Sequence, residues 1–343
     1  MQNKVTVLTT VFNGKEFLKE AIESTLNQTY KNFDFLIIDD CSLDNSVSII
    51  KSYDDPRIKL VRNNKNLGTA ETINKALSLI DSKYVVRLDQ DDVSLPNRIE
   101  EQIRYLNEFP NLDIVCSWEH TIDQNGKILR DWKTQINNYG EFIGPVLLGL
   151  CPIWHPSIAF KKQSMINAGG FNKKYTRAED FEVTVKMALK RLNAGVVPQF
   201  LLLQREHQNR QSVQFEKEQK KMNKKVHNEA LNFFIKNINL NSFVNYLSLE
   251  SKSSFEKKDL IRFSEILNIL LKNVAKKQNL NNQEVKSLKK VFIKRIGLGL
   301  FYSNKFKFLP NIFFKIIFQL LSPLANPVIR KFLSKIYRII KSK

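Results

Sequence analysis

Cysteine, glycine and proline are scarce in this sequence of 343 residues, and no long apolar run occurs in it. The three cysteines, Cys41, Cys116 and Cys151, are odd in number and lack metal-ligand spacing, so we expect no disulfide framework and a reducing cytosol. With 11 glycines and ten prolines, the chain is not collagenous or of low complexity. The closest approach to a membrane-spanning run, residues 308–325, is interrupted by polar side chains and two prolines, so we expect no transmembrane helix. The apolar run near the N-terminus is too short for a signal peptide.

Acidic residues are scarce in the C-terminal third. The whole chain carries 54 Lys and Arg against 34 Asp and Glu, a formal net charge of +20 at pH 7. Residues 1–214 hold 27 basic and 26 acidic side chains, a balance of +1, whereas residues 215–343 hold 27 basic and 8 acidic ones, a balance of +19. After Glu284 there are 14 basic residues and no acidic one. We therefore predict a nearly neutral domain over 1–214 and a basic, mainly helical region over 215–343.

The first hundred residues alternate short apolar strands with amphipathic helices, which is typical of a mostly parallel sheet flanked by helices. The residues Val5–Val11 form a continuous apolar and β-branched run that fits a strand buried on both faces. A Gln-Asn-Gly turn at 124–126 predicts a hairpin within 112–129. Further strands are expected at 33–38, 58–62, 84–88, 157–160 and 196–203. Helices are expected at 14–28, with Asn13 as its cap, and at 46–53, 69–80, 96–109, 138–149 and 179–192.

Two groups of aspartates follow predicted strands. Asp39 and Asp40 end the second strand, and Asp89, Asp91 and Asp92 end the fourth. In an open parallel sheet, the carboxyl ends of the strands meet at the edge where ligands bind. Three carboxylates this close repel one another unless a cation or hydrogen-bond donors neutralise them, and their oxygens suit Mg²⁺ or Mn²⁺ bound together with substrate phosphates. The alternative is that these aspartates cap the following helices or are solvated loop residues.

Several motifs, in order along residues 3–212, resemble the GT-A fold, family 2 glycosyltransferases. They are VTVLTTVFN (5–13), QTY (28–30), IDDCSLD (38–44), RLDQDD (87–92) with LPNR (95–98) after it, HPS (155–157), GGF (169–171) and AED (178–180). The form of the aspartate motif looks most like bacterial capsule, exopolysaccharide and lipopolysaccharide transferases. The resemblance implies an α/β GT-A nucleotide-diphospho-sugar transferase fold. It also implies metal-dependent, inverting transfer of a sugar from a nucleotide-diphosphate sugar, by default a UDP-sugar, to a hydroxyl of a glycan or lipid-linked acceptor.

On the nucleotide side, the resemblance implies that Thr10, Phe12 and Asp40 hold the nucleobase, with Asp39 beside them. Phe12 stands where many members have tyrosine, so its ring can stack on the base but a hydroxyl contact is lost. The alternative for Phe12 is an aromatic residue of the core.

On the diphosphate side, the resemblance assigns Asp89 and Asp91 to the ribose and to the Mn²⁺ or Mg²⁺ ion that bridges the donor phosphates. Asp91 is the expected metal ligand, and Asp92 is the second choice. His207, in a segment similar to the family's closing motif, is expected to reach the metal or the diphosphate. The ion would act as a Lewis acid on the leaving group. Arg87 either faces the diphosphate or forms a salt bridge at the strand end.

Asp180 lies where the family has its general base, at the start of a helix after the GGF loop. A carboxylate there takes the proton of the acceptor hydroxyl while that oxygen attacks the anomeric carbon from the opposite face, which inverts the configuration. Alternatively, Glu179 and Asp180 are acidic residues that favour the positive N-terminus of a helix. His155 would line the cleft between donor and acceptor, or be a buried structural histidine.

Lysine and arginine alternate with Phe, Ile and Leu in residues 285–343, the composition of an amphipathic helix at a membrane surface. Each cation near an anionic leaflet adds roughly 1 kcal/mol. We therefore expect a cytoplasmic protein that associates peripherally with the anionic inner face of the cell membrane, where lipid-linked acceptors lie. The alternative is a helical domain that packs on the catalytic domain or on a second subunit, as in a homo-oligomer.

Other functions are less consistent with the sequence. A nucleotidyltransferase needs a glycine-rich phosphate loop after the first strand, and residues 9–15 contain a single glycine. Nucleic acid is not an expected partner, because the basic region lacks finger spacing, an RNP-like strand and basic-zipper heptads. A catalytically inactive, membrane-associated scaffold that binds sugar nucleotides with the same fold is the alternative to an enzyme.

Overall fold

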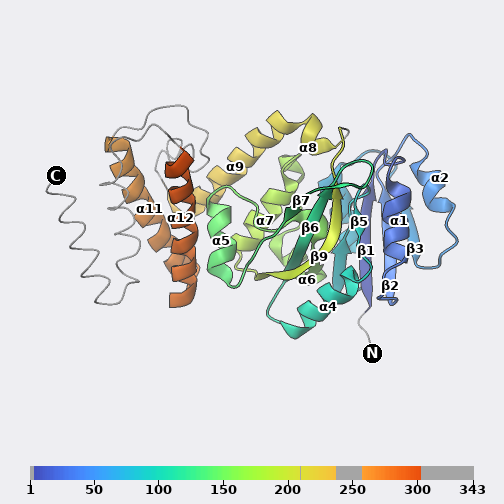
Figure 1. Cartoon of the computed structure of the whole chain (residues 1–343), viewed down its shortest axis with the longest axis horizontal. Coiled ribbons are helices and arrows are strands. Elements are labelled where there is room, and N and C mark those ends of the chain that lie inside the picture. Colours follow the sequence, from blue (N-terminus) through green and yellow to red (C-terminus); the bar gives the residue numbers. More distant parts are fainter. Residues whose placement is uncertain (1–3, 209, 237–256, 303–343) are drawn as a thin grey trace. The chain divides into compact units, whose positions relative to one another are not determined.

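The computed structural model describes residues 4–208, 210–236 and 257–302 (Figure 1). Of the predicted amphipathic tail over 285–343, the part from 303 onward lies outside the described residues. Of the helices in the described ranges, none is both long enough and apolar enough to span a bilayer.

Within these ranges, nine strands form one mixed sheet. They are β1 (Val5–Val11), β2 (Phe33–Asp39), β3 (Ile58–Arg62), β4 (Tyr84–Arg87), β5 (Val93–Ser94), β6 (Ile114–Ile122), β7 (Ile128–Trp132), β8 (Ala159–Lys161) and β9 (Ala194–Arg205). Neighbouring strands follow the order β3-β2-β1-β4-β8-β6-β9-β5, and β7 pairs with β6 outside this path. Strands β1 to β4 pair in parallel, as do β6 and β9, whereas β8 runs antiparallel to both β4 and β6. The predicted hairpin is the antiparallel pair β6–β7.

Helices cover both faces of the parallel strands. On one face, Val7 of β1 and Phe35 of β2 belong to one buried cluster with side chains from α1 (Leu18–Leu26), α2 (Ser46–Lys51) and α4 (Arg98–Glu108). Because successive strand residues point to opposite faces, Leu8 and Leu36 point the other way, where α3 (Thr69–Leu79) packs on β1 and β2. A strand covered on both faces does not alternate apolar with charged residues, and β1 accordingly contains only Val, Leu and Thr.

The remaining elements of this part lie along the second half of the sheet. They are the short 3₁₀ turns η1 (His155–Ser157) and η2 (Lys173–Tyr175) and the helices α6 (Lys162–Ala168), α7 (Glu179–Leu189) and α8 (Gln211–Gln214). Helix α6 packs on α7 and β8, and η1 lies against β4, β6 and β9. Because η1 packs on β4, its first residue, His155, lies near Arg87 at the carboxyl end of that strand.

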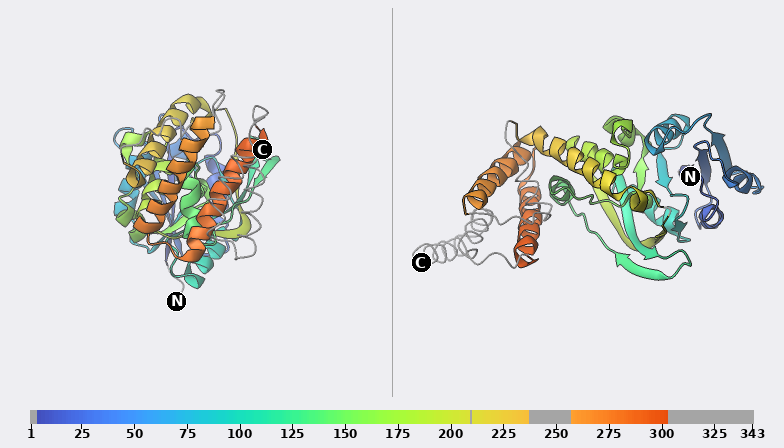
Figure 2. Two further views of the ribbon diagram at one scale, coloured as in Figure 1. Left: turned by 90° about the vertical axis from the view of Figure 1, so that its left-hand side faces the viewer. Right: turned by 90° about the horizontal axis from the view of Figure 1, so that it is seen from above.

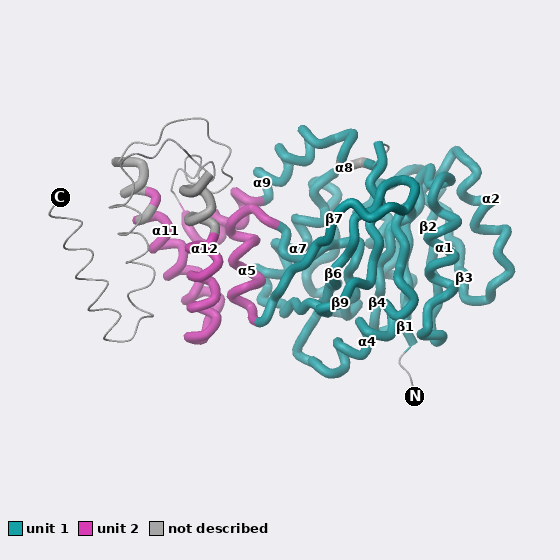
Figure 3. The backbone as a smooth tube through the Cα atoms, in the orientation of Figure 1, with its two compact units in different colours: residues 1–137, 151–226 teal, residues 138–150, 227–343 magenta. Residues whose placement is uncertain are grey.

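The chain divides into two compact units (Figure 3). Unit 1 comprises residues 1–137 and 151–226, and unit 2 comprises residues 138–150 and 227–343. The division falls inside α9 (Glu216–Phe234), later than the expected boundary after residue 214, and α5 (Tyr139–Leu147) counts with the second unit. The reason lies in packing, because the apolar face of α5 is covered by α12 (Asn282–Tyr302).

In unit 2, α5 lies beside α12 (the green and the red helix in Figure 2), and two glycines of α5 allow this close approach. A Cβ added to Gly140 would lie 2.1 Å from the carbonyl oxygen of Glu284, and one added to Gly144 would lie 3.0 Å from the side chain of Val291. These glycines are four residues apart and so share one helix face. The hydroxyl of Tyr139 also bonds the side chain of Gln278, just after α11 (Lys257–Lys277), at 3.0 Å.

Candidate active site

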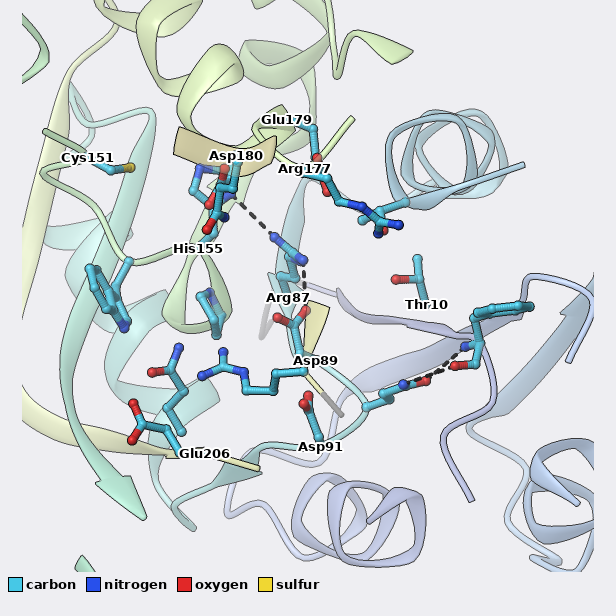
Figure 4. Close-up of a pocket in the computed structure, with 18 of the residues that line it drawn as sticks. Thr10, Arg87, Asp89, Asp91, Cys151, His155, Arg177, Glu179, Asp180 and Glu206 are labelled. Atoms are coloured by element: carbon cyan, nitrogen blue, oxygen red, sulfur yellow. Dashed lines mark hydrogen bonds and ion pairs between the residues drawn. The ribbon is translucent and has the colours of Figure 1, made fainter. Parts of the chain in front are cut away.

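A cavity of about 510 Å³ opens in unit 1 where the carboxyl ends of β1 and β4 meet the start of α7 and the end of β9. The parallel pairing of β1 with β2 and β4 brings these strand ends to one edge, as expected for an open α/β sheet. Figure 4 shows Arg87 and Asp89 between Thr10 on one side and Cys151 and Glu206 on the other. The cavity thus has two ends, with charged side chains between them.

Ten of the twelve residues singled out from the sequence line this cavity. They are Thr10, Phe12, Asp40, Arg87, Asp89, Asp91, His155, Glu179, Asp180 and His207. Asp39 and Asp92 are not among the lining residues. The motifs that are far apart in sequence therefore converge on one site.

The side chain of Asp39 bonds to the neighbouring strand β3 and to the turn after β2. It is fully buried and opposite Arg62 of β3 in the strand register. The guanidinium of Arg62 pairs with its carboxylate at 3.1 Å, and the backbone N–H of Ser42 donates to it at 3.2 Å. These bonds hold the turn after β2, so the carboxylate of Asp39 is directed to Arg62 and Ser42, while the next residue, Asp40, lines the cavity.

Asp92 lies behind the aspartate turn. Its side chain is fully buried, with one oxygen accepting the backbone N–H of Arg205 at 2.9 Å and the other without a hydrogen-bond partner in the described structure. Burial, with the nearby charges of Asp91 and Asp89, raises its pKa well above the ordinary value. A carboxyl that is fully buried and does not line the cavity is poorly placed as the second metal ligand expected from the sequence.

Two polar contacts shape the end of the cavity near Thr10. The carboxylate of Asp40 accepts the backbone N–H groups of Leu67 and Gly68, both at 2.8 Å, and thereby holds the turn before α3. The side-chain amide of Gln90 exchanges two hydrogen bonds with the backbone of Phe12, at 2.9 and 3.2 Å. Gln90 therefore ties the end of β1 to the aspartate turn, leaving the Phe12 ring 39% exposed at the cavity. The sequence motif contains Gln90 but does not reveal this role.

Arg87 connects the middle of the site. Its guanidinium pairs with Asp89 at 2.8 Å and lies 3.4 Å from Nδ1 of His155 (Figure 4). The Nε2 atom of His155 lies 3.0 Å from the Thr184 hydroxyl, which donates to the backbone carbonyl of Asp180. Burial, aided by the charge of Arg87, lowers the pKa of His155 to about 3, so its ring is neutral at pH 7. The histidine thus links β4 to the first turn of α7.

The carboxylate of Asp91 and the ring of His207 are the groups best arranged to hold a cation. The Nε2 atom of His207 lies 3.0 Å from an oxygen of Asp91, although the two residues are 116 positions apart in the sequence. This contact is a hydrogen bond, and its length would also suit two adjacent ligands of an octahedral ion, which lie about 3.0 Å apart when the bonds are about 2.1 Å. The described residues contain no group of three or more His, Cys, Asp or Glu arranged for a metal. An ion here would therefore need further ligands from a bound phosphate.

Two carboxyl groups begin α7 at the cavity. Burial raises the pKa of Asp180, and this rise is opposed by the backbone N–H of Phe181, which donates to it at 2.7 Å, and by the charge of Arg87. Burial also raises the pKa of Glu179, whose Oε2 atom has no hydrogen-bond partner in the described structure. A carboxylate with a raised pKa is a stronger base than an exposed one, which suits proton abstraction.

The end of the cavity beside Glu206 was not predicted from the sequence. The guanidinium of Arg130 on β7 bonds both carboxylate oxygens of Glu206, which follows β9. The rings of Trp132 and Trp154 lie 5.0 Å apart at an interplanar angle of 30°, and both line the cavity. No local motif marks these residues, since they meet only through the pairing of β7 with β6 and the turn before η1.

Two buried arginines support the site from behind. Arg98 of α4 donates to the backbone carbonyl of Arg87 and, at 2.9 Å, to that of Pro156. Arg205 donates to the backbone carbonyl of Asp91 at 3.1 Å and lies 4.6 Å above the ring of Phe17, which also packs on His207. Both guanidinium groups fix backbone segments that carry cavity residues.

Comparison with known proteins adds independent information. Residues 6–169 match the family model described as Glycosyl transferase family 2. An uncharacterized glycosyltransferase of Methanocaldococcus jannaschii is 32% identical over 202 residues, which cover 58% of this chain and 69% of the relative.

Two solved structures are similar in fold. Residues 1–349 of S. aureus TarS, in complex with UDP-GlcNAc, align with a TM-score of 0.53 and 14% identity over 99% of this chain and 90% of that one. The mannosyltransferase PcManGT from Pyrobaculum calidifontis, in complex with GDP-Man and Mn²⁺, aligns with a TM-score of 0.52 and 14% identity over 92% of this chain and 86% of that one. These likenesses confirm the fold class predicted from the sequence.

Proposed function

Because the chain belongs to glycosyl transferase family 2 and is therefore a glycosyltransferase that uses nucleotide sugars, we propose a specific course for its reaction. The enzyme transfers a sugar from a nucleotide-diphosphate sugar, by default a UDP-sugar, to a hydroxyl of a glycan or lipid-linked acceptor, with inversion at the anomeric carbon. The reaction depends on Mn²⁺ or Mg²⁺. It serves the synthesis of a cell-surface polysaccharide such as a capsule or lipopolysaccharide.

One observation carries this proposal. Carboxylates from the end of β4 and from the start of α7, Asp89, Asp91 and Asp180, line one cavity together with Thr10 and Asp40. Such a cavity offers a place for a nucleotide at one end and a base for an acceptor hydroxyl near the middle. The complexes of TarS with UDP-GlcNAc and of PcManGT with GDP-Man and Mn²⁺ support this reading.

Donor binding is assigned to the end of the cavity near Thr10. The exposed ring of Phe12 stacks on the nucleobase, and Asp40, which already orders the turn before α3, accepts a hydrogen bond from it. Thr10 contacts the nucleoside between them, and Asp39 supports this turn from behind through Arg62. Asp89 faces the ribose and is held in place by Arg87.

Asp91, with His207, is assigned to the divalent ion. Their separation of 3.0 Å would suit two adjacent ligands, and oxygens of the donor diphosphate would supply the others. When bound, the ion supplies positive charge where the leaving diphosphate becomes more negative. Arg205 keeps the backbone of Asp91 in position for this role.

Asp180 is assigned as the general base. Its raised pKa and its place at the cavity suit removal of the proton from the acceptor hydroxyl as the oxygen attacks. Neutral His155 holds the first turn of α7 through Thr184 and thus orients this carboxylate. Attack from the face opposite the leaving diphosphate gives the inverted product.

The test is a screen for nucleotide release from UDP-, dTDP- and GDP-sugars in the presence of Mn²⁺ or Mg²⁺. The wild type should turn over at least one donor, and Asp91→Asn and Asp180→Asn should each lower the rate at least 100-fold. The matched control is Asp131→Asn on β7, because that carboxylate pairs with His120 of β6 and does not line the cavity. Unchanged rates in both site variants, or no donor turnover and no metal-dependent donor binding, would favour the inactive scaffold.

The membrane association of the enzyme is proposed from charge. The stretch 285–343 contains 14 basic and no acidic residues, so it is attracted to an anionic cytoplasmic leaflet, close to lipid-linked acceptors. Packing of the C-terminal helices on a second copy of the chain is the alternative.

A further inference from the structure

We propose that the end of the cavity lined by Trp132 and Trp154 is a subsite for a pyranose ring of the acceptor. This proposal rests on the function proposed above and adds the chemical class of the acceptor, a glycan rather than a polyol phosphate or a bare lipid phosphate. The two tryptophans form an aromatic wall, and the Arg130–Glu206 pair beside them forms its polar rim.

The aromatic wall is unusual for its exposure. Strand β7 pairs with β6 and all five of its residues are exposed, yet it carries Trp132 with 42% of its surface accessible. Strand alternation places Arg130 on the same face as Trp132, and both line the cavity. Large exposed aromatic groups rimmed by polar residues mark binding sites more often than chance positions. The exposed ring of Trp132 is therefore available to a ligand in the cavity.

The wall also lies beside the proposed base. Trp154 directly precedes His155, and His155 is linked through the Thr184 hydroxyl to the backbone of Asp180. The end that holds Thr10 lies on the other side of Arg87 and Asp89 (Figure 4). With the nucleotide at Thr10 and the base at Asp180, the remaining end of the cavity is where an acceptor must approach.

The chemistry of the wall selects a sugar ring. A pyranose has an apolar C–H face, which packs on an indole, and a rim of hydroxyls, which exchange hydrogen bonds with charged groups. Trp132 and Trp154 supply the first surface, and Arg130 and Glu206 supply the second. A polyol phosphate has no apolar face to pack on the indoles, and an acyl chain has no polar group to bond with Arg130 or Glu206.

The kinetic experiment separates donor chemistry from acceptor binding. Nucleotide release to water reports on the donor half of the site, and its stimulation by methyl glucoside, methyl galactoside and methyl mannoside reports on the acceptor half. We expect Trp132→Ala to leave release to water within about twofold and to raise the half-saturating pyranoside concentration about tenfold. Trp132→Phe should recover most of the loss. Leu129→Ala is the matched control, because Leu129 is 48% exposed on the same strand but outside the cavity lining.

A binding measurement keeps the inference testable without turnover. The chain has three tryptophans, so Trp118→Phe leaves both emitting residues at the wall. Methyl pyranosides should quench this emission in the protein loaded with UDP and Mn²⁺, and glycerol 3-phosphate should not. Quenching by glycerol 3-phosphate alone, or equal half-saturation for wild type and Trp132→Ala, would overturn the subsite while leaving donor turnover intact. Failure of the wild type to release nucleotide from any donor would instead overturn the proposed function and the subsite together.

Discussion

Replacement of Arg205 should show how strongly one buried side chain supports the site. Its side chain is 2% exposed and its guanidinium donates to three backbone carbonyls, those of Asp91 at 3.1 Å, Gln124 at 3.0 Å and Asp123 at 3.3 Å. It also pairs with Glu20. The substitution Arg205→Met keeps an unbranched stem and removes every donor.

The magnitude follows from these contacts. Each lost hydrogen bond to a carbonyl costs about 1 kcal/mol, and the lost contact with the ring of Phe17 adds about 1 kcal/mol. The side chain of Glu20 is 58% exposed, so water solvates it and its loss adds little. Relief of the buried charge opposes these losses. We therefore expect Arg205→Met to lower the free energy of unfolding by about 3 kcal/mol.

Equilibrium unfolding in urea, followed by circular dichroism, measures this change. The matched control is Arg104→Met on α4, whose guanidinium pairs with Glu101 and Glu108 but is 54% exposed, so its loss should cost below about 1 kcal/mol. Because Arg205 holds the backbone of Asp91, the variant should also need more Mn²⁺ for half-maximal donor turnover. An Arg205→Met protein as stable as Arg104→Met, with unchanged Mn²⁺ dependence, would refute the reasoning.

Three further predictions concern other parts of the chain. Gly140→Ala should destabilise unit 2 by about 3 kcal/mol in thermal unfolding, because its Cβ would lie 2.1 Å from the Glu284 carbonyl oxygen. The control Gly144→Ala meets only a side chain and should cost about 1 kcal/mol. Equal costs for the two variants would contradict this prediction. Burial raises the pKa of Glu119 from its ordinary value of 4.5 to about 8, so the folded state retains a proton that the unfolded state loses. The resulting contribution to the free energy of unfolding is fully present below about pH 4.5 and is lost by up to about 1.4 kcal/mol per pH unit toward pH 8. Glu119→Gln should abolish this part of the pH dependence, as measured by urea unfolding. Parallel pH profiles for the two proteins would disprove the prediction. Removal of 310–343, outside the described residues, should release the protein from membrane fractions without abolishing transfer to a soluble acceptor, and unchanged membrane recovery would argue against the proposed anchor.

The succession of strands and helices along the first hundred residues and the position of the aspartates could be predicted because both depend on local pattern. A short run of mainly β-branched residues such as Val5–Val11 favours a strand, and this preference does not depend on which elements pack beside it. A parallel sheet then brings the residues after β1, β2 and β4 to one edge, so the convergence of Asp40, Asp89 and Asp91 follows from the sequence.

Which neighbouring carboxylate faces the cavity was decided by tertiary structure. Asp39 turns to Arg62 because β3 lies next to β2, and Asp92 turns inward because Arg205 of β9 lies against the aspartate turn. A one-residue step along the chain reverses the direction of a side chain, and only the neighbouring strands determine which direction is the open one.

The acceptor end of the cavity and the course of α5 depend wholly on long-range contacts. Arg130 meets Glu206 across 76 residues, and Trp132 meets Trp154 through the β6–β7 hairpin, so no local spacing marks them as a site. The apolar face of α5 does not indicate from the sequence which element it packs on. The effect of Gly140 and Gly144 becomes visible only in the structure, where they allow the backbones of α5 and α12 to come close. The sequence by itself determined the sheet, the aspartate turns and the family, because these depend on local periodicity and motif. Only the tertiary structure decided which side chains share the cavity, because that depends on the order in which distant strands and helices pack.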